Sequence, residues 1–192
     1  MRVLGISGSP RRGGNTEVLL DRVLQGARSA GADTEKLILN ELDFKPCQEC
    51  GGCGRTGTCV IKDDIALIRK KIEKSDCVVI SSPIFFCNIS AQAKSMIDRF
   101  QVLWVRKYVL KVRVASGSKK TGAFLCVSGD KKGVFFKCAE KVIKAFFITL
   151  GIGYKGSIFC GGINLKGEIK KRKEVLNKAF NLGAALATEK QG

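Results

Sequence analysis

Residues 77–81 read Cys77-Val78-Val79-Ile80-Ser81, a short apolar run with no polar side chain inside it. A strand with one face in water alternates apolar and polar side chains, so a continuous run predicts a strand that is buried on both faces. Such strands occur at the centre of parallel sheets that carry helices on both sides. We therefore expect this stretch to be a central strand of an α/β domain.

The rest of the chain alternates short apolar runs with segments of helical periodicity. In one helical segment Leu19, Val23 and Ala27 recur on a single face, and Gly31 follows as a typical helix end. The expected strands are residues 3–7, 34–39, 77–81, 121–128 and 154–160, and the expected helices are 16–30, 64–74, 91–107, 135–150 and 170–188. Because strands and helices alternate throughout, we expect an α/β fold with a parallel sheet covered on both faces.

Length and composition restrict the class of protein. A chain of 192 residues suits one domain with a full core, so residues 1–192 are expected to be a single domain. No apolar run reaches the roughly 18 residues of a membrane helix, and the sequence starts with a strand where a secretory leader would have a charged and then a long apolar segment. Nine cysteines in such a chain predict a reducing, cytoplasmic location without a membrane partner.

The formal net charge is +17, from 34 lysine and arginine residues against 17 aspartate and glutamate residues. Basic patches can neutralise nucleic-acid phosphates, but here the lysines are dispersed and no helix-turn-helix pattern accompanies them, which disfavours nucleic acid as the partner. An acidic protein attracted over long range also fits this charge. High lysine content without histidine fits a thermophilic source as well, so charge alone does not identify the function.

Four cysteines, Cys47, Cys50, Cys53 and Cys59, form a compact Cys-x2-Cys-x2-Cys-x5-Cys pattern after the second expected strand. Thiols at intervals of three can converge on one centre, and the glycines among them leave room for a bulky group. Four thiolates are the ligands of an iron–sulfur cluster, and the tight spacing is the one that ferredoxins use. A structural zinc site is the alternative, although zinc ligands usually come as two separated cysteine pairs. We expect residues 40–62 to form a cluster loop.

The loop after the first strand reads Ser7-Gly8-Ser9-Pro10-Arg11-Arg12-Gly13-Gly14-Asn15-Thr16. Its hydroxyl and amide side chains, together with the free N–H groups of a helix start, predict an anion cradle, and Arg11 adds a charged donor. The loop has neither the Gly-Lys-Ser/Thr end of a Walker loop nor the Gly-x-Gly-x-x-Gly spacing of a dinucleotide fold. We expect a phosphate group here, and the alternative is an ordinary Gly/Pro turn that caps a helix.

The loop after the central strand reads Ser81-Ser82-Pro83-Ile84-Phe85-Phe86-Cys87-Asn88-Ile89-Ser90. Ligands of parallel α/β sheets lie beyond the carboxyl ends of the strands, so this loop is expected beside the phosphate cradle. Phe85 and Phe86 provide a flat apolar platform for a planar heterocycle, and Asn88 could hydrogen-bond to a ring edge. The two aromatic rings are explained equally well as part of the core.

These loops together resemble those of a known family. Residues 7–11, 14–16 and 82–86 resemble the FMN-binding loops of flavodoxin-like NAD(P)H-dependent FMN reductases, and residues 94–99 are similar to the helix that follows in that superfamily. With the four-cysteine motif after the second strand, the chain resembles the iron–sulfur flavoproteins of anaerobes, especially methanogens and related archaea. The resemblance covers nearly the whole sequence.

The resemblance implies a doubly wound, flavodoxin-like sheet with strand order 2-1-3-4-5, and one FMN and one [4Fe-4S] cluster in each subunit of a homodimer or homotetramer. Cys47, Cys50, Cys53 and Cys59 would bind the cluster. FMN would lie on three loops, through Ser7, Ser9, Pro10, Arg11, Asn15 and Thr16; through Pro83, Ile84, Phe85, Phe86, Cys87 and Asn88; and through Ser128, Gly129 and Asp130. Two departures are that Phe85 stands where relatives often have tyrosine, and that the third loop is less glycine-rich than expected.

The resemblance also implies a redox function, in which electrons pass from ferredoxin or a similar acidic carrier to dioxygen, peroxide or another acceptor. FMN couples one-electron to two-electron chemistry, and the absence of histidine removes Cys–His and Ser–His–Asp mechanisms. The alternatives are an NAD(P)H-dependent FMN or quinone reductase and, in another class, a cluster-based redox sensor or nucleic-acid-binding regulator.

Two smaller expectations concern other segments. Cys77, Cys126 and Cys138 are expected to be small buried residues within strands and a helix. The basic stretch of residues 108–120 is expected to be a mobile insertion.

Overall fold

The computed structural model describes residues 1–112, 120–131 and 133–188. It contains a five-stranded sheet with the order β2-β1-β3-β4-β5, in which all neighbouring strands are parallel. The strands are β1 (Arg2–Ser7), β2 (Asp33–Ile38), β3 (Cys77–Pro83), β4 (Thr121–Val127) and β5 (Gly153–Cys160). The expected fold class and strand order are therefore confirmed, and residues 77–81 lie in the middle strand.

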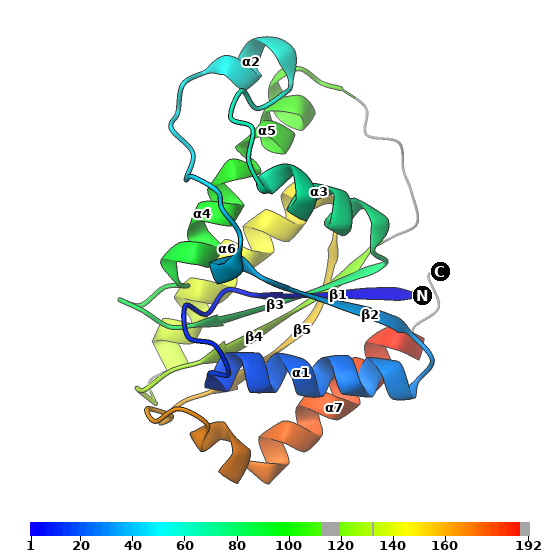
Figure 1. Cartoon of the computed structure of the whole chain (residues 1–192), viewed down its shortest axis with the longest axis vertical. Coiled ribbons are helices and arrows are strands. Elements are labelled where there is room, and N and C mark those ends of the chain that lie inside the picture. Colours follow the sequence, from blue (N-terminus) through cyan, green and yellow to red (C-terminus); the bar gives the residue numbers. More distant parts are fainter. Residues whose placement is uncertain (113–119, 132, 189–192) are drawn as a thin grey trace.

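Helices cover both faces of the sheet (Figure 1). One face carries α1 (Asn15–Ser29) and α7 (Lys173–Thr188), and the other carries α3 (Ile65–Lys74), α4 (Ala91–Arg99) and α6 (Gly133–Leu150). Each face has its own apolar cluster, and Leu19, Val23 and Ala27 of α1 are fully buried as their spacing predicted. The sheet thus presents the carboxyl ends of its strands along a single edge, at the left of Figure 1.

Helices α1 and α7 touch through their backbones. A Cβ atom added to Gly183 would lie 1.9 Å from the carbonyl oxygen of Val23, and one added to Gly26 would lie 1.9 Å from that of Phe180. Only glycine fits at such a close approach. This contact fixes α1, whose N-terminus follows the loop after β1.

The single helix expected over residues 91–107 is wrong in its extent. Helix α4 ends at Arg99, and a four-residue helix α5 (Gln101–Trp104) and a π-helical turn η2 (Val105–Val109) follow. The break is at Phe100, whose buried ring packs edge-on against Phe146 of α6 at a centroid distance of 5.2 Å. This long-range packing directs α5 away from the sheet (Figure 1).

The segment between β2 and α3 leaves the sheet and passes beside α5. It starts with a 3-10 turn η1 (Leu39–Glu41) and includes a short helix α2 (Gly52–Thr56), which the sequence did not suggest. Helix α2 packs against η2 at the end of the molecule farthest from α7 (Figure 1). Near the C-terminus a 3-10 turn η3 (Glu168–Lys171) precedes α7, so that helix begins three residues later than expected.

Other expectations have mixed outcomes. Cys77 and Cys126 are buried as expected, but Cys138 is exposed, because it lies on the face of α6 opposite Phe136, Ala139 and Ile143. Of the expected mobile stretch 108–120, residues 113–119 lie outside the described residues. Within the part of the chain that the structure describes, no helix has both the length and the apolar character needed to cross a membrane.

Candidate functional site

The loop after β1 is tied to the neighbouring strand and to α4. The N–H of Gly8 donates to Ser81 O at 2.8 Å, and the hydroxyl of Ser90, which caps α4, donates to Gly8 O. Ser9 Oγ accepts a hydrogen bond of 3.1 Å from the N–H of Arg11, which forms a tight turn. Ser7 is fully buried, and its hydroxyl has no hydrogen-bond partner among the described residues.

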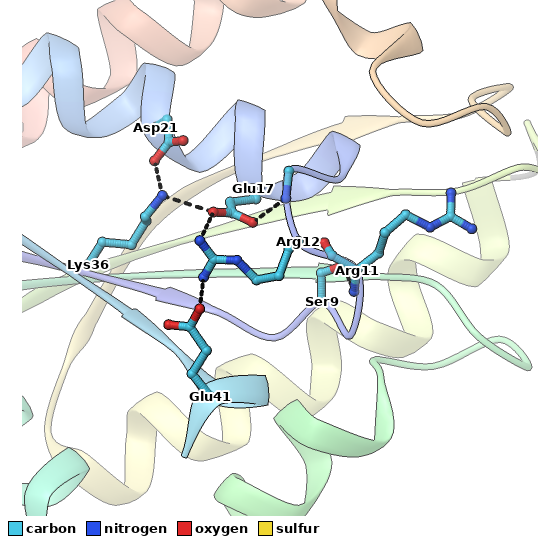
Figure 2. Close-up of polar contacts among 8 residues, drawn as sticks. Ser9, Arg11, Arg12, Glu17, Asp21, Lys36 and Glu41 are labelled. Atoms are coloured by element: carbon cyan, nitrogen blue, oxygen red, sulfur yellow. Dashed lines mark hydrogen bonds and ion pairs between the residues drawn. The ribbon is translucent and has the colours of Figure 1, made fainter.

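The two arginines of this loop have different environments (Figure 2). Arg12 is bound on both sides, with Nη2 3.5 Å from Glu17 Oε1 and Nη1 2.5 Å from Glu41 Oε1. Arg11 points away from that network in Figure 2 and lines the cavity described below. Arg11 is therefore the arginine of this loop that is placed to bind a ligand.

The buried side chain of Glu17 stabilises the loop after β1. Its carboxylate is 4% exposed and accepts hydrogen bonds of 2.8 Å from Gly13 N–H and 3.0 Å from Lys36 Nζ. Burial alone would raise the pKa of Glu17, but these hydrogen bonds and the charges of Lys36 and Arg12 outweigh it and hold the pKa below its usual value. The carboxylate thus stays charged and keeps the Gly13 turn in place (Figure 2).

Asn15 and Thr16 lie at the start of α1. The amide of Asn15 bridges to the segment after β5, since Nδ2 donates to Leu165 O at 2.8 Å and Oδ1 accepts from Ile169 N at 3.2 Å. Thr16 is 2% exposed. Asn15 therefore joins two loops of the same edge, a structural contact that local sequence does not indicate.

The loop after β3 ends in a strained two-residue turn. Phe85 and Asn88 exchange backbone hydrogen bonds of 2.8 and 3.0 Å, and Phe86 and Cys87 between them have φ values of 46° and 63°. Two positive φ values identify a type I′ turn, which favours Asn-Gly over Phe-Cys. The Phe86 ring is fully exposed, whereas the ring of Phe85 is 48% exposed and faces the cavity.

The third wall comes from the loops after β4 and β5. Ser128 is buried, and its hydroxyl accepts a hydrogen bond of 3.1 Å from Asp130 N–H. Gly129 lies against Asn164, whose Oδ1 would be only 2.2 Å from a Cβ atom at position 129. A side chain at position 129 would displace the Asn164 amide, which also lines the cavity.

These loops enclose a cavity of about 320 Å³. Nine of the expected FMN residues line it, together with four that were not expected: Ser9, Pro10, Arg11, Asn15, Thr16, Pro83, Ile84, Phe85 and Gly129, with Gly14, Val127, Ile163 and Asn164. The other six lie outside the lining. Ser7 and Ser128 are buried, and Phe86 and Cys87 form the exposed turn. Asn88 Oδ1 accepts a hydrogen bond from Ile89 N–H, and Asp130 lies beside Ser128.

A second cavity, of about 460 Å³, contains all four cysteines of the motif. Cys47 and Cys50 are exposed, and Cys53 and Cys59 are half-buried. The wall opposite the loop is formed by Asp98 and Arg99 of α4, Gln101 and Val102 of α5, and Val105 of η2. Over the described residues, no three Cys, Asp or Glu side chains are close enough to hold a single metal ion.

Comparison with known proteins identifies the family of this chain. Residues 1–154 match the model of the family described as NADPH-dependent FMN reductase. The chain belongs to the NADPH-dependent FMN reductase family. A member of this family is an oxidoreductase, so the expected enzyme class is confirmed.

The relatives of this chain within the FMN reductase family include two iron–sulfur flavoproteins. The one from Archaeoglobus fulgidus is 37% identical over 188 residues, which cover 97% of this chain and 79% of the relative. The one from Methanosarcina thermophila is 34% identical over 133 residues, 69% of this chain and 66% of the relative. The chain thus spans about two thirds to four fifths of these relatives, and the expected likeness to iron–sulfur flavoproteins is confirmed.

The fold of this family member is also that of solved structures. An NAD(P)H:quinone oxidoreductase from Methanothermobacter marburgensis superposes with a TM-score of 0.69 at 19% identity, over 97% of this chain and 98% of that one. At this identity the likeness concerns the fold alone.

The sequence did not indicate a role for one charged residue of this family member, Arg99. Arg99 is buried at the end of α4, beside Cys59 and Asp63. Burial alone would raise the pKa of Asp63, but hydrogen bonds from Arg99 and from the N–H groups of Lys45 and Ile65 hold it below its usual value. A buried arginine needs a partner, but no signal in the local sequence marks Arg99, because its burial and its partners come from contacts with residues 45–63.

Proposed function

We propose that the chain is a redox flavoprotein that binds FMN in the 320 Å³ cavity and a [4Fe-4S] cluster in the 460 Å³ cavity. The observation that carries the proposal is the presence of both cavities in one domain, with four thiols in one and a hydroxyl-rich loop with an aromatic wall in the other. The family match to FMN reductases and the iron–sulfur flavoprotein relatives support the same pair of cofactors.

The first cavity fits a phosphate joined to a planar ring. Backbone N–H groups at the start of α1, the side chain of Arg11 and the hydroxyl of Thr16 would supply donors at one end. Phe85 supplies an apolar wall at the other end. We assign the phosphate to the loop of residues 7–16 and the ring to the space between residues 83–85 and Gly129.

The second cavity fits a cluster better than a zinc ion. A structural zinc site draws four sulfur atoms to about 2.3 Å from one ion. Here all four cysteines line one cavity of about 460 Å³, which is more room than a single ion needs. Inorganic iron and sulfide between the thiolates would fill such a space.

When bound, the two cofactors would supply coupled one- and two-electron chemistry. The protein's own residues bind and orient them. Arg11 would neutralise phosphate charge, and Phe85 and Ile84 would contact the ring. The chain has no histidine, so no imidazole moves a proton at either cavity.

The remaining parts of the proposal concern partners. The net charge of +17 favours an acidic electron carrier such as a ferredoxin, with binding that weakens as salt increases. We further propose a homodimer or homotetramer in the cytoplasm, with dioxygen, peroxide or another carrier as the acceptor.

A direct test is anaerobic purification followed by an absorption spectrum and by analysis of iron, sulfide, zinc and FMN. We expect one FMN and, from the four-thiolate ligand count, about four iron atoms per chain. Zinc without sulfide would contradict the cluster assignment.

An NAD(P)H-dependent FMN or quinone reductase is the second candidate, and the family match favours it. Anaerobic mixing with NADPH or with reduced ferredoxin distinguishes the two donors by the rate of flavin bleaching. If NADPH reduces the flavin and ferredoxin does not, the second candidate replaces the first.

A further inference from the structure

Arg99 makes an unusual set of contacts for a residue at the end of a helix. It is 2% exposed, and both terminal nitrogens of its guanidinium donate to residues 45–63, whereas its Nε has no hydrogen-bond partner among the described residues. Nη1 donates to Lys45 O at 2.7 Å and to Asp63 Oδ2 at 2.5 Å. Nη2 donates to Asp63 Oδ1 at 3.1 Å, to Ile61 O at 3.2 Å and to Cys59 Sγ at 3.5 Å.

These contacts reach both ends of the motif. Lys45 lies two residues before Cys47, and Ile61 lies two residues after Cys59. One side chain on α4 therefore fastens both stems of the loop, and the bidentate pair with Asp63 fixes the plane of the guanidinium. Backbone N–H groups of Asp43 and Lys45 donate to the carboxylates of Asp64 and Asp63, so the two stems are also tied to each other.

The guanidinium also sets the charge around one ligand. A cation and an N–H donor next to a thiolate stabilise the more negative, reduced form of a cluster more than its oxidised form, because reduction adds one negative charge. Asp63 opposes part of this effect, because its carboxylate lies on the other side of the same guanidinium. Arg99 is therefore expected to raise the reduction potential of the cluster, and Asp63 to lower it.

We infer that Arg99 is a positioning residue, which holds Cys59 in place and raises the reduction potential of the cluster. Asp63 opposes part of this rise in potential. The inference rests on the proposed function. The expected effect is confined to the four-thiol cavity, so FMN binding should be unaffected.

The test compares Arg99→Lys and Asp63→Asn with the wild-type protein, all purified anaerobically as full chains. Lysine keeps the charge but cannot form the planar fork that reaches Asp63 and Cys59 together. The measurements are iron, sulfide and FMN per chain, and the cluster midpoint potential from a redox titration followed by electron paramagnetic resonance. Lys144→Gln is the matched control, because Lys144 is a surface cation that pairs with Glu140 on α6, and neither residue lines the four-thiol cavity.

Arg99→Lys keeps the cation but loses the N–H donor to Cys59 Sγ. We therefore expect it to shift the ratio of reduced to oxidised cluster roughly tenfold toward the oxidised form at a fixed potential, which equals 59 mV for one electron. Asp63→Asn is expected to shift it in the opposite direction, and Lys144→Gln to leave it unchanged. FMN content should stay at the wild-type level in all three variants.

Shifts of the same sign in Arg99→Lys and Asp63→Asn, or no shift in either, would overturn the inference. If Arg99→Lys loses the cluster and Asp63→Asn keeps an unchanged potential, Arg99 only holds the fold, and the electrostatic role is wrong. A wild-type protein that contains zinc and no sulfide would instead refute the proposed function, and the metal analysis reports this separately.

Discussion

The two cavities are built in different ways. The 320 Å³ cavity lies on loops after β1, β3, β4 and β5, which are neighbours in the sheet, so backbone pairing sets where each loop begins. The 460 Å³ cavity lies on an excursion after β2, the edge strand, and its far wall consists of side chains from α4, α5 and η2. The first site is positioned by the sheet, and the second by a few side-chain contacts.

Because different parts of the molecule position the two sites, we expect that one site can lose its cofactor while the other keeps its own. A change in the packing beneath the sheet should disturb the loop of residues 7–16, while a change in the cysteine loop should leave that loop intact. The four predictions below test this separation.

The largest expected effect is the loss of one cavity's cofactor without the other. Cys59→Ala removes one of the four thiolates, so we expect iron and sulfide to fall well below the wild-type content while FMN content is unchanged. Cys138→Ala, at an exposed position on α6, is the control and should change neither. Equal loss of FMN in Cys59→Ala would show that the cavities are not independent.

The next effect concerns the packing beneath the first cavity. Gly183→Ala would place a methyl group 1.9 Å from Val23 O, so α1 and α7 must separate, at an expected loss of about 1–3 kcal/mol or more in the free energy of unfolding. Thermal unfolding should show a fall of several degrees. Gly54→Ala in α2, where the added Cβ meets nothing within 4 Å, is the comparison and should be nearly neutral.

A third prediction separates the two arginines of the loop after β1. Arg11→Ala should weaken FMN binding by roughly ten- to a hundredfold, since a hydrogen bond to a charged group contributes about 1.5–3 kcal/mol. Arg12→Ala should change the affinity much less, because Arg12 is already bound to Glu17 and Glu41. Fluorescence titration of the FMN-free protein measures both, and equal effects would contradict the assignment of Arg11.

The smallest effect is a pH dependence of stability that arises from Glu17. The pKa of Glu17 is lower in the folded protein than in the unfolded chain, so its contribution is complete above the ordinary carboxyl value of about 4.3 and disappears as pH falls through the lower folded-state value. Glu17→Gln should therefore lose about 1–3 kcal/mol at pH 7. Urea unfolding should show this difference shrinking below about pH 4, and a difference that stays constant would contradict it.

Local sequence predicted those features that depend on neighbours in the chain. The apolar run at 77–81 and the spacing of Leu19, Val23 and Ala27 were sufficient for the central strand and for one helix face. The strand order came with the family resemblance, because helix and strand alternation alone does not specify it.

Features that depend on distant contacts were not predictable. The helix break at Phe100 reflects packing against Phe146, and the contacts of Asn15 are with Leu165 and Ile169. The turn at Phe86 and Cys87 opposes local preference, since Asn-Gly would suit its positive φ values better. Such strained turns occur where surrounding structure holds them, often next to functional sites.

The position of β2 at the edge of the sheet also has a consequence for how such a domain can change over time. A segment that leaves an edge strand crosses no other strand, so its length can vary without altering the register of the sheet. Loop-closure entropy grows only with the logarithm of length, and a loop about four times shorter would differ by only about 1 kcal/mol. The cysteine segment is thus a removable module, and a chain with a short β2–α3 turn in its place should still fold around the other cavity.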